Sequence, residues 1–298
     1  MSGRGESRGR TLVALVPLAW LAATVLAPFL IMLGISFSES IIANPPYAPL
    51  VTAGENGLAI HLHLDNYRML LEDPLYLAAY IGSLRIAGIS TLLCLALGYP
   101  MAYAIARARP TLRTPLLMLV VLPFWTSFLI RVYAWMGILN TNGLANQLLM
   151  ALGLTDQPLA LLHTNFAVYL GITYSYLPFM VLPLYSILEK LDPHLLEAAE
   201  DLGCTPFRAF LRVTLPLSMR GVLAGALLVF VPAVGEFVIP DLLGGPDTLM
   251  IGKVLWTEFF DNRDWPLASA LAVALALLVV LPVMLLRRRQ YGLEGAAP

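Results

Sequence analysis

The ionisable residues inside apolar stretches are the ones that could do chemistry in this sequence. Glu236 has only apolar residues and glycine around it, in the run PAVGEFVIP. Because an ionised carboxylate facing hydrocarbon is too costly, we expect Glu236 to face the interior of the protein. There it can contact a cationic amine, with the ring of Trp125 or Tyr174 supplying a π face. Alternatively, it can form a salt bridge with Arg131 or Arg85 that only holds helices together.

An aromatic-rich run from Pro123 to Trp135, PFWTSFLIRVYAW, surrounds Arg131. An arginine near the centre of a membrane helix costs about 2.5–3.5 kcal/mol on insertion scales, so Arg131 should reach an interface or pair with an anion. The aromatic side chains of the run could line a path for a cation or form an interfacial belt. Tyr174 and Tyr176 are two positions apart, so they cannot both face one lumen. We assign to the candidate path Trp125, Tyr133, Tyr174, Glu236 and Asp241.

The composition places these residues in a membrane protein. The chain of 298 residues is 59% hydrophobic and 12% charged, whereas soluble domains have about 25% charged residues. Six apolar runs of roughly 20 residues or more are long enough to cross a bilayer. They cover approximately residues 12–36, 77–106, 114–139, 166–188, 217–239 and 266–286. We therefore predict an all-α polytopic membrane protein with six transmembrane helices.

The positions of the cations predict the orientation. Thirteen of the 18 Lys and Arg residues lie on alternate connections, which include both termini and the loop at residues 190–216, and three lie on the other connections. By the positive-inside rule, both termini and this loop are expected in the cytoplasm. The first apolar run exceeds the roughly 7–15 residues of a signal-peptide core, so we expect it to be a retained helix. The opposite, acidic connections are either a solvated face or a negative mouth that attracts a cationic solute.

The loop at residues 190–216 contains signals for two short helices. The pair Asp192–Pro193 is a cap followed by a first-turn proline, and Gly203 is placed to end that helix. The pair Thr205–Pro206 repeats the start signal, and Pro216 is expected to enforce the next boundary. We predict two short helices that meet at a glycine.

The second of these helices is amphipathic. Phe207, Phe210 and Leu211 make an apolar ridge, and Arg208 and Arg212 form a basic row beside it. A segment of this kind could lie on lipid headgroups or fold under its own helix bundle.

The same loop resembles the EAA signature of bacterial ABC importer permeases. That signature reads Glu-Ala-Ala, three residues, Gly, nine residues, Ile, one residue and Leu-Pro, and here Val213 stands for Ile. The resemblance implies a type I ABC importer permease fold in a single transmembrane domain over residues 1–298. It also implies that the loop docks into a groove on a separate ATP-hydrolysing subunit. The ATPase-coupling residues are then expected to be Glu197, Ala198, Ala199, Gly203, Phe207, Arg208 and Phe210.

Two further stretches resemble the spermidine/putrescine subgroup of these permeases. They are the run from Pro123 to Trp135, with Asn142–Gly143 after it, and the run GEFVIPDLLGG from Gly235 to Gly245. The resemblance implies one subunit of a polyamine importer in the bacterial inner membrane. Its partners would be a second homologous permease, two copies of a cytoplasmic ATP-binding subunit, an outer substrate-binding protein and membrane lipid, without nucleic acid.

The chain itself is not expected to be an enzyme. The spacing of Gly245 and Gly252 is wrong for a phosphate loop, and Val254 stands where Ser or Thr would hold magnesium. His61 and His63 have a spacing compatible with a metal but no clear third ligand. We therefore predict no catalytic residue, no metal and no cofactor, with ATP bound by the partner subunit.

The sequence leaves other functions open. The same machinery could carry an opine, a phosphonate or iron, since subgroup motifs follow ancestry as well as cargo. A secondary transporter would need an internal repeat that we do not find, and a membrane scaffold would leave the Glu-Ala-Ala loop without a purpose. Gly221 and Gly225 form a small-xxx-small pair, which could accept either an internal helix or the second permease.

Overall fold

The structure is a computed structural model that describes residues 15–54 and 57–294. The chain divides into two compact units, one of residues 1–77 with 255–298 and the other of residues 78–254.

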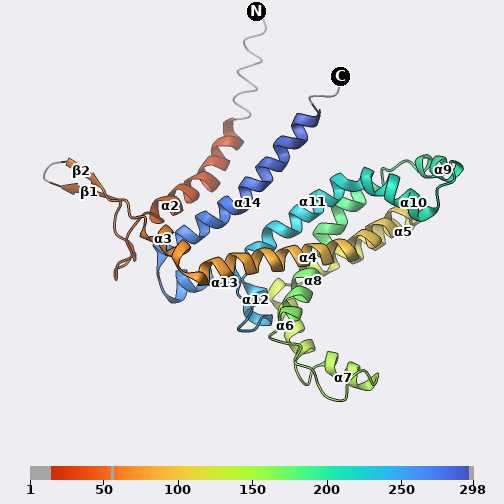
Figure 1. The fold of residues 1–298 in the computed structure, drawn as a ribbon, viewed down its shortest axis with the longest axis horizontal. Helices are drawn as coiled ribbons and strands as arrows, with labels where there is room; N and C mark the ends of the chain where they lie inside the picture. Colours follow the sequence, from red (N-terminus) through yellow and green to blue (C-terminus); the bar gives the residue numbers. More distant parts are fainter. Residues whose placement is uncertain (1–14, 55–56, 295–298) are drawn as a thin grey trace, which may run out of the picture. The chain divides into compact units, whose positions relative to one another are not determined.

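In the first unit, a membrane-length helix from each end of the chain lies side by side with the other (Figure 1). Its elements are the π-helical turn η1 (Ala22–Leu26), α2 (Ala27–Ile35), β1 (Val51–Gly54), β2 (Gly57–Ile60), α3 (Asp65–Glu72), the π-helical turn η4 (Thr257–Asp261) and α14 (Trp265–Glu294). Both α2 and α3 pack against α14. The two strands form an antiparallel hairpin with Thr52 opposite Ala59, which adds a short sheet to the predicted all-helical fold.

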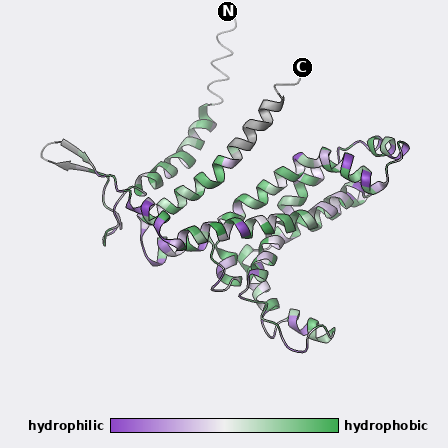
Figure 2. Cartoon of the chain, viewed as in Figure 1, coloured by the Kyte–Doolittle hydropathy of each residue, from purple (hydrophilic) through white to green (hydrophobic). Residues whose placement is uncertain are grey.

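The second unit is a bundle of longer and shorter helices. Its elements are most of α4 (Pro74–Arg107), α5 (Pro110–Val121), the 3₁₀ turn η2 (Leu122–Trp125), α6 (Phe128–Leu139), α7 (Leu144–Ala151), α8 (Asn165–Leu188), α9 (His194–Asp201), α10 (Pro206–Ala209), the π-helical turn η3 (Phe210–Thr214), α11 (Leu215–Val234), α12 (Val238–Leu243) and most of α13 (Ile251–Trp256). The core lies between α4, α8 and α11, where Cys94, Met180, Leu184 and Val229 are fully buried. Figure 2 shows hydrophobic residues along these helices and hydrophilic residues gathered around α9.

The apolar runs become helices, with one break that the sequence did not predict. In the described part of the chain, five helical stretches are long and apolar enough to cross a membrane: Leu15–Ile35, Pro74–Arg107, Asn165–Leu188, Pro206–Val234 and Trp265–Pro282. A sixth candidate consists of two pieces, Pro110–Trp125 and Phe128–Ala151, which meet at an angle of 89°. The expected continuous helix over residues 114–139 is therefore wrong. Pro123 shortens the last turn of the first piece to a 3₁₀ turn, and Thr126 has an extended backbone (φ −102°, ψ 151°) that no helix can continue.

The small-residue pair on α11 serves an internal contact. A Cβ atom at Gly221 would lie 3.2 Å from the carbonyl oxygen of Pro183, and one at Gly225 would lie 3.1 Å from that of Met180. Both carbonyls belong to α8, so the two glycines allow α11 and α8 to approach closely. Of the two alternatives raised by the sequence, the structure places the internal helix at this face.

We expect Gly225→Leu to destabilise the second unit. The new side chain would have to displace Met180 and the α8 backbone, and overpacking of this kind costs about 1–3 kcal/mol. Thermal unfolding of the purified protein in nanodiscs should show a lower midpoint. Gly88→Leu is the matched control, because a Cβ atom at Gly88 meets nothing within 4 Å. Equal shifts for the two variants would argue against the close contact between α8 and α11.

Candidate functional site

The polar loop at residues 190–216 forms the predicted helix and elbow. Asp192 Oδ1 accepts a hydrogen bond of 3.0 Å from the amide of His194 at the start of α9. At the end of α9 the amide of Cys204 donates to the carbonyl of Ala199 over 3.0 Å, and Gly203 has φ +79°. A left-handed residue with such a bond is a common helix ending, and glycine adopts it without a Cβ clash. The prediction of a glycine elbow is confirmed.

The predicted boundary at Pro216 is wrong. α10, η3 and α11 continue without interruption from Pro206 to Val234. In η3 the amide of Leu215 donates to the carbonyl of Phe210, five residues earlier. The missing N–H of Pro216 therefore falls where the chain returns from the wider π-helical spacing to the α-helical spacing, and that position has no need of a donor. The elbow is thus attached directly to a membrane-length helix.

The side chains of the loop separate into an outer and an inner set. Phe207 is 70% exposed, and Ala198, Arg208 and the carboxylate of Glu197 are exposed as well. In contrast, Ala199 is buried, and the ring of Phe210 stands edge-on to Tyr99 of α4 with 5.4 Å between ring centroids. The apolar ridge expected on one face is therefore divided between the surface and the core.

The Glu197 carboxylate already has a partner on its own helix. Glu197 Oε2 lies 2.9 Å from Nδ1 of His194, one turn earlier. This hydrogen bond, assisted by the charge of Asp192, raises the pKa of His194 above its ordinary value. The protonated imidazole balances part of the negative charge of α9 at mildly acidic pH, and that balance is lost as the pH rises through the pKa of His194.

A second group of residues surrounds the break between α11 and α12. Glu236 is 8% exposed, and its Oε1 accepts hydrogen bonds from the amides of Val238 (3.1 Å) and Ile239 (3.4 Å). Its Oε2 accepts a hydrogen bond from the hydroxyl of Tyr176 on α8. The carboxylate thus caps the N-terminus of α12, where unpaired amides favour a negative charge.

The salt bridge raised as an alternative for Glu236 is not found in the described part of the chain. Among the described residues, no ion pair joins Glu236 to Arg131 or Arg85. The guanidinium of Arg131 instead lies over the ring of Phe124, 5.5 Å from its centroid, and over that of Phe128 at 5.7 Å. The interior placement expected for Glu236 holds, and its partners are neutral donors rather than a cation.

The remaining predicted path residues are in different surroundings. Trp125 and Tyr133 are 80% and 57% exposed on this chain, and Tyr174 stands edge-on to Trp135 with 5.5 Å between centroids. Asp241, on α12, pairs with Lys253 of α13 over 3.2 Å. The structure therefore joins Glu236 and Asp241 through α12 but gives the aromatic residues separate neighbours.

Tyr176 is a site residue that the sequence did not single out. The rule that two tyrosines two positions apart face different directions is obeyed, but it does not say which one faces the carboxylate. No other signal in the sequence separates Tyr174 from Tyr176. The choice depends on how α8 is rotated against α12.

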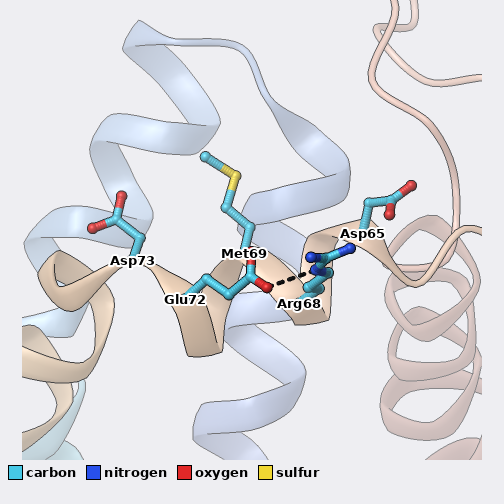
Figure 3. A pocket seen from close by; sticks show the side chains of 5 residues that line it. All are labelled: Asp65, Arg68, Met69, Glu72 and Asp73. Atoms are coloured by element: carbon cyan, nitrogen blue, oxygen red, sulfur yellow. Dashed lines mark hydrogen bonds and ion pairs between the residues drawn. The ribbon is translucent and has the colours of Figure 1, made fainter.

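An open pocket of about 520 Å³ lies on α3, in the first unit (Figure 3). It is lined by Asp65, Arg68, Met69, Glu72 and Asp73. Within it, Arg68 Nε donates to Glu72 Oε1 over 2.6 Å, and Asp73 Oδ1 accepts from the amide of Leu75 over 2.8 Å. These acidic residues belong to the expected negative connections, and none of the predicted path residues is among them.

Comparison with known proteins finds a matching family model and named relatives. Residues 94–291 match the model of the family described as binding-protein-dependent transport system inner membrane component. The chain is 43% identical over 270 residues to the spermidine/putrescine transport system permease protein PotB of Haemophilus influenzae, covering 91% of this chain and 90% of that one. The protein of the same name from Escherichia coli K12 is 43% identical over 267 residues, covering 90% and 92%.

A solved structure shares the fold. A crystal structure of a bacterial ABC transporter involved in the import of the acidic polysaccharide alginate superposes with a TM-score of 0.70 over 96% of both chains, at 17% identity. This level of identity supports the architecture alone. The family model matches about two thirds of this chain. Together, these findings show that the chain is a multi-pass membrane protein that belongs to the family of binding-protein-dependent transport system inner membrane components.

Proposed function

We propose that this chain is one transmembrane permease subunit of an ATP-driven importer of polyamines such as spermidine and putrescine. The observation that carries the proposal is the 43% identity, over nine tenths of the chain, to permeases named for these two solutes. A separate subunit hydrolyses ATP, and this chain converts that hydrolysis into alternating access of a path through the bilayer.

The proposed assembly contains the other parts of such an importer. A second, homologous permease pairs with this chain, two copies of an ATP-binding subunit lie in the cytoplasm, and a substrate-binding protein delivers cargo from outside. Both termini and the loop at residues 190–216 lie on the cytoplasmic side, in accordance with the distribution of Lys and Arg.

The loop at residues 190–216 is the proposed docking element for the ATP-binding subunit. Its exposed side chains, Phe207 above all, enter the groove of the partner. Phe210 and Ala199, which face inward, hold the loop against α4 and transmit its displacement. A rigid element is needed for this because a rigid-body rotation cannot be passed through a flexible loop.

Glu236 gives the proposed path a fixed negative charge. Its three hydrogen-bond partners are neutral, so the charge is not cancelled locally and attracts an ammonium group. Trp125, Tyr133 and Tyr174, which have other neighbours in this chain, are the proposed aromatic contacts at other points along the path, where ring faces bind cations.

The cargo can be tested directly. The chain is reconstituted in proteoliposomes with its second permease, its ATP-binding subunit and its binding protein, and uptake of labelled spermidine and putrescine is measured with and without ATP. We expect saturable uptake of both that requires ATP. Uptake of an opine, a phosphonate or iron in place of polyamines would contradict the cargo. Failure of an ATP-binding subunit to co-purify would contradict the importer itself.

Truncation of Phe207 tests the docking contact. Large exposed aromatic side chains at an interface commonly contribute more than about 1 kcal/mol, so Phe207→Ala should weaken binding of the ATP-binding subunit by roughly fivefold or more. The affinity is measured by titrating that subunit onto the permease pair in nanodiscs. Leu154→Ala is the control, since Leu154 is 66% exposed but follows α7 and is not part of the loop at residues 190–216. Unchanged affinity in Phe207→Ala would remove this residue from the interface.

A further inference from the structure

Asp241 and Lys253 form an exposed ion pair near the break between α11 and α12. Among the described residues 78–254, no other ion pair is found at this break. Asp241 Oδ1 lies 3.2 Å from Lys253 Nζ, and the two side chains are 55% and 38% exposed. Asp241 is in the first turn of α12, the helix that Glu236 caps. One member of the pair, Asp241, therefore lies on the short helix whose first amides bind the Glu236 carboxylate.

The backbone beside Lys253 is held firmly against this break. A Cβ atom at Gly252 would lie 2.5 Å from the carbonyl oxygens of both Gly235 and Glu236, so only glycine allows this approach. One residue earlier, the amide of Ile251 donates to Ser83 Oγ of α4 over 2.8 Å. The backbone next to Lys253 is therefore fixed by these contacts, whereas the long side chain of Lys253 can change its conformation.

The two carboxylates of this region differ in how readily they can exchange partners. Glu236 is 8% exposed and accepts from Tyr176 and from two amides, so a new partner would have to disrupt the start of α12. Asp241 is more than half exposed and pairs with a flexible alkylammonium. Exposed ion pairs contribute little net stability, because water screens the charges and ordering long side chains costs entropy.

We propose that Asp241 is the exchangeable cation site of the path and that Lys253 is a tethered substitute for the cargo. The end of a lysine side chain is a primary alkylammonium, the same chemical group that a polyamine presents at each end. Lys253 occupies Asp241 while no cargo is present, and an arriving ammonium group displaces it. This inference depends on the proposed polyamine cargo and adds the residue that competes with it.

Competition by a small amine tests the inference. In the complete importer, Lys253→Met leaves Asp241 without its resident ammonium, so free ethylammonium should bind there and slow spermidine uptake. At an ethylammonium concentration of about twice its dissociation constant, the expected decrease is about threefold, from the factor 1 + [L]/Kd. The wild type should be unaffected at the same concentration. Sodium chloride replaces ethylammonium chloride at equal ionic strength in the reference, because salt screens exposed charges.

Four further variants test whether the effect depends on Asp241. Lys253→Met/Asp241→Asn should lose the sensitivity to ethylammonium, because the carboxylate is gone, and Lys253→Arg should lose it because a tethered cation is restored. Arg68→Met is the matched control, since it opens the exposed pair of Arg68 with Glu72 on α3, whose atoms are 2.6 Å apart, and it should stay insensitive. Lys253→Gln provides a second uncharged variant if Lys253→Met does not assemble.

The outcomes are distinct. Sensitivity that appears in Lys253→Met and disappears in the double variant supports the inference. Normal spermidine uptake with no sensitivity in either uncharged variant overturns it, and so does sensitivity that persists without Asp241 or that also appears in Arg68→Met. Absence of spermidine uptake by the wild type would overturn the proposed cargo and, with it, this inference.

Discussion

An importer carrying Gly203→Val is expected to insert into the membrane and to lose most of its transport. Gly203 has φ +79° and is exposed, and a Cβ atom there would meet no other group within 4 Å. The obstacle is therefore the backbone, since a β-branched residue in a left-handed conformation costs about 1–3 kcal/mol. The chain would relieve the strain by changing the angle between α9 and α10. Because Gly203 is exposed and a side chain there would touch no core residue, membrane insertion should not be affected.

The size of the loss follows from what the elbow transmits. Coupling between two sites is commonly about 1–3 kcal/mol, so a misdirected elbow should reduce uptake by about 5- to 150-fold. Uptake and ATP hydrolysis are measured in the same proteoliposomes, and hydrolysis should no longer respond to the loaded binding protein. Gly153→Val is the matched control: Gly153 has φ +68° and open space around its Cβ position, but it follows α7. Normal uptake in Gly203→Val, or an equal loss in Gly153→Val, would exclude a special role for the elbow.

Substitution of Glu236 is expected to have the second large effect on uptake. Two variants separate the contribution of its charge from that of its hydrogen bonds to α12. Glu236→Gln keeps an oxygen that accepts from the amides of α12 but removes the charge, whereas Glu236→Ala removes both. Contacts to charged groups contribute about 1.5–3 kcal/mol, so Glu236→Gln should lower polyamine uptake by about tenfold or more. Glu236→Ala should in addition lower the free energy of unfolding by about 1–3 kcal/mol, because buried donors are left without an acceptor.

A second buried glutamate provides the control for Glu236. Glu258, in the other unit, is also 8% exposed and accepts from Tyr76 over 3.2 Å and from Asn262 over 2.8 Å. Glu258→Gln removes a buried charge of the same kind outside the proposed path, and uptake should remain within about twofold of the wild type. Wild-type uptake in Glu236→Gln, with loss only in Glu236→Ala, would reduce Glu236 to a cap of α12.

Several features of the molecule could be predicted because neighbouring residues determine them. The elbow at Gly203 depends on a glycine placed between two cap signals, and the membrane spans depend on runs of apolar residues in continuous stretches of the chain. The interior position of Glu236 follows from the cost of exposing a carboxylate to lipid. The family was also predicted, because the Glu-Ala-Ala motif has a fixed local spacing.

The two wrong predictions concern prolines, whose effect depends on the hydrogen bonds of the turns around them. Pro216 ends a helix in an ordinary α-helical ladder, but the π-helical turn before it removes the need for its N–H. Pro123 was expected inside a continuous span, and instead the chain bends by 89° just after it. In both cases the proline was recognised, but its consequence depended on the hydrogen bonds of the surrounding turns.

The sequence by itself determined the class of the protein, the approximate positions of five candidate spans among the described residues, the elbow and the interior placement of one acidic residue. Only the tertiary structure decided which partners these groups have: Tyr176 rather than Tyr174 for Glu236, α8 rather than another chain for Gly225, and Lys253 for Asp241. The physical reason is that propensity, capping and hydropathy act between residues close in the chain. The rotation of one helix against another depends on packing among residues that are far apart in sequence, and no local pattern records it.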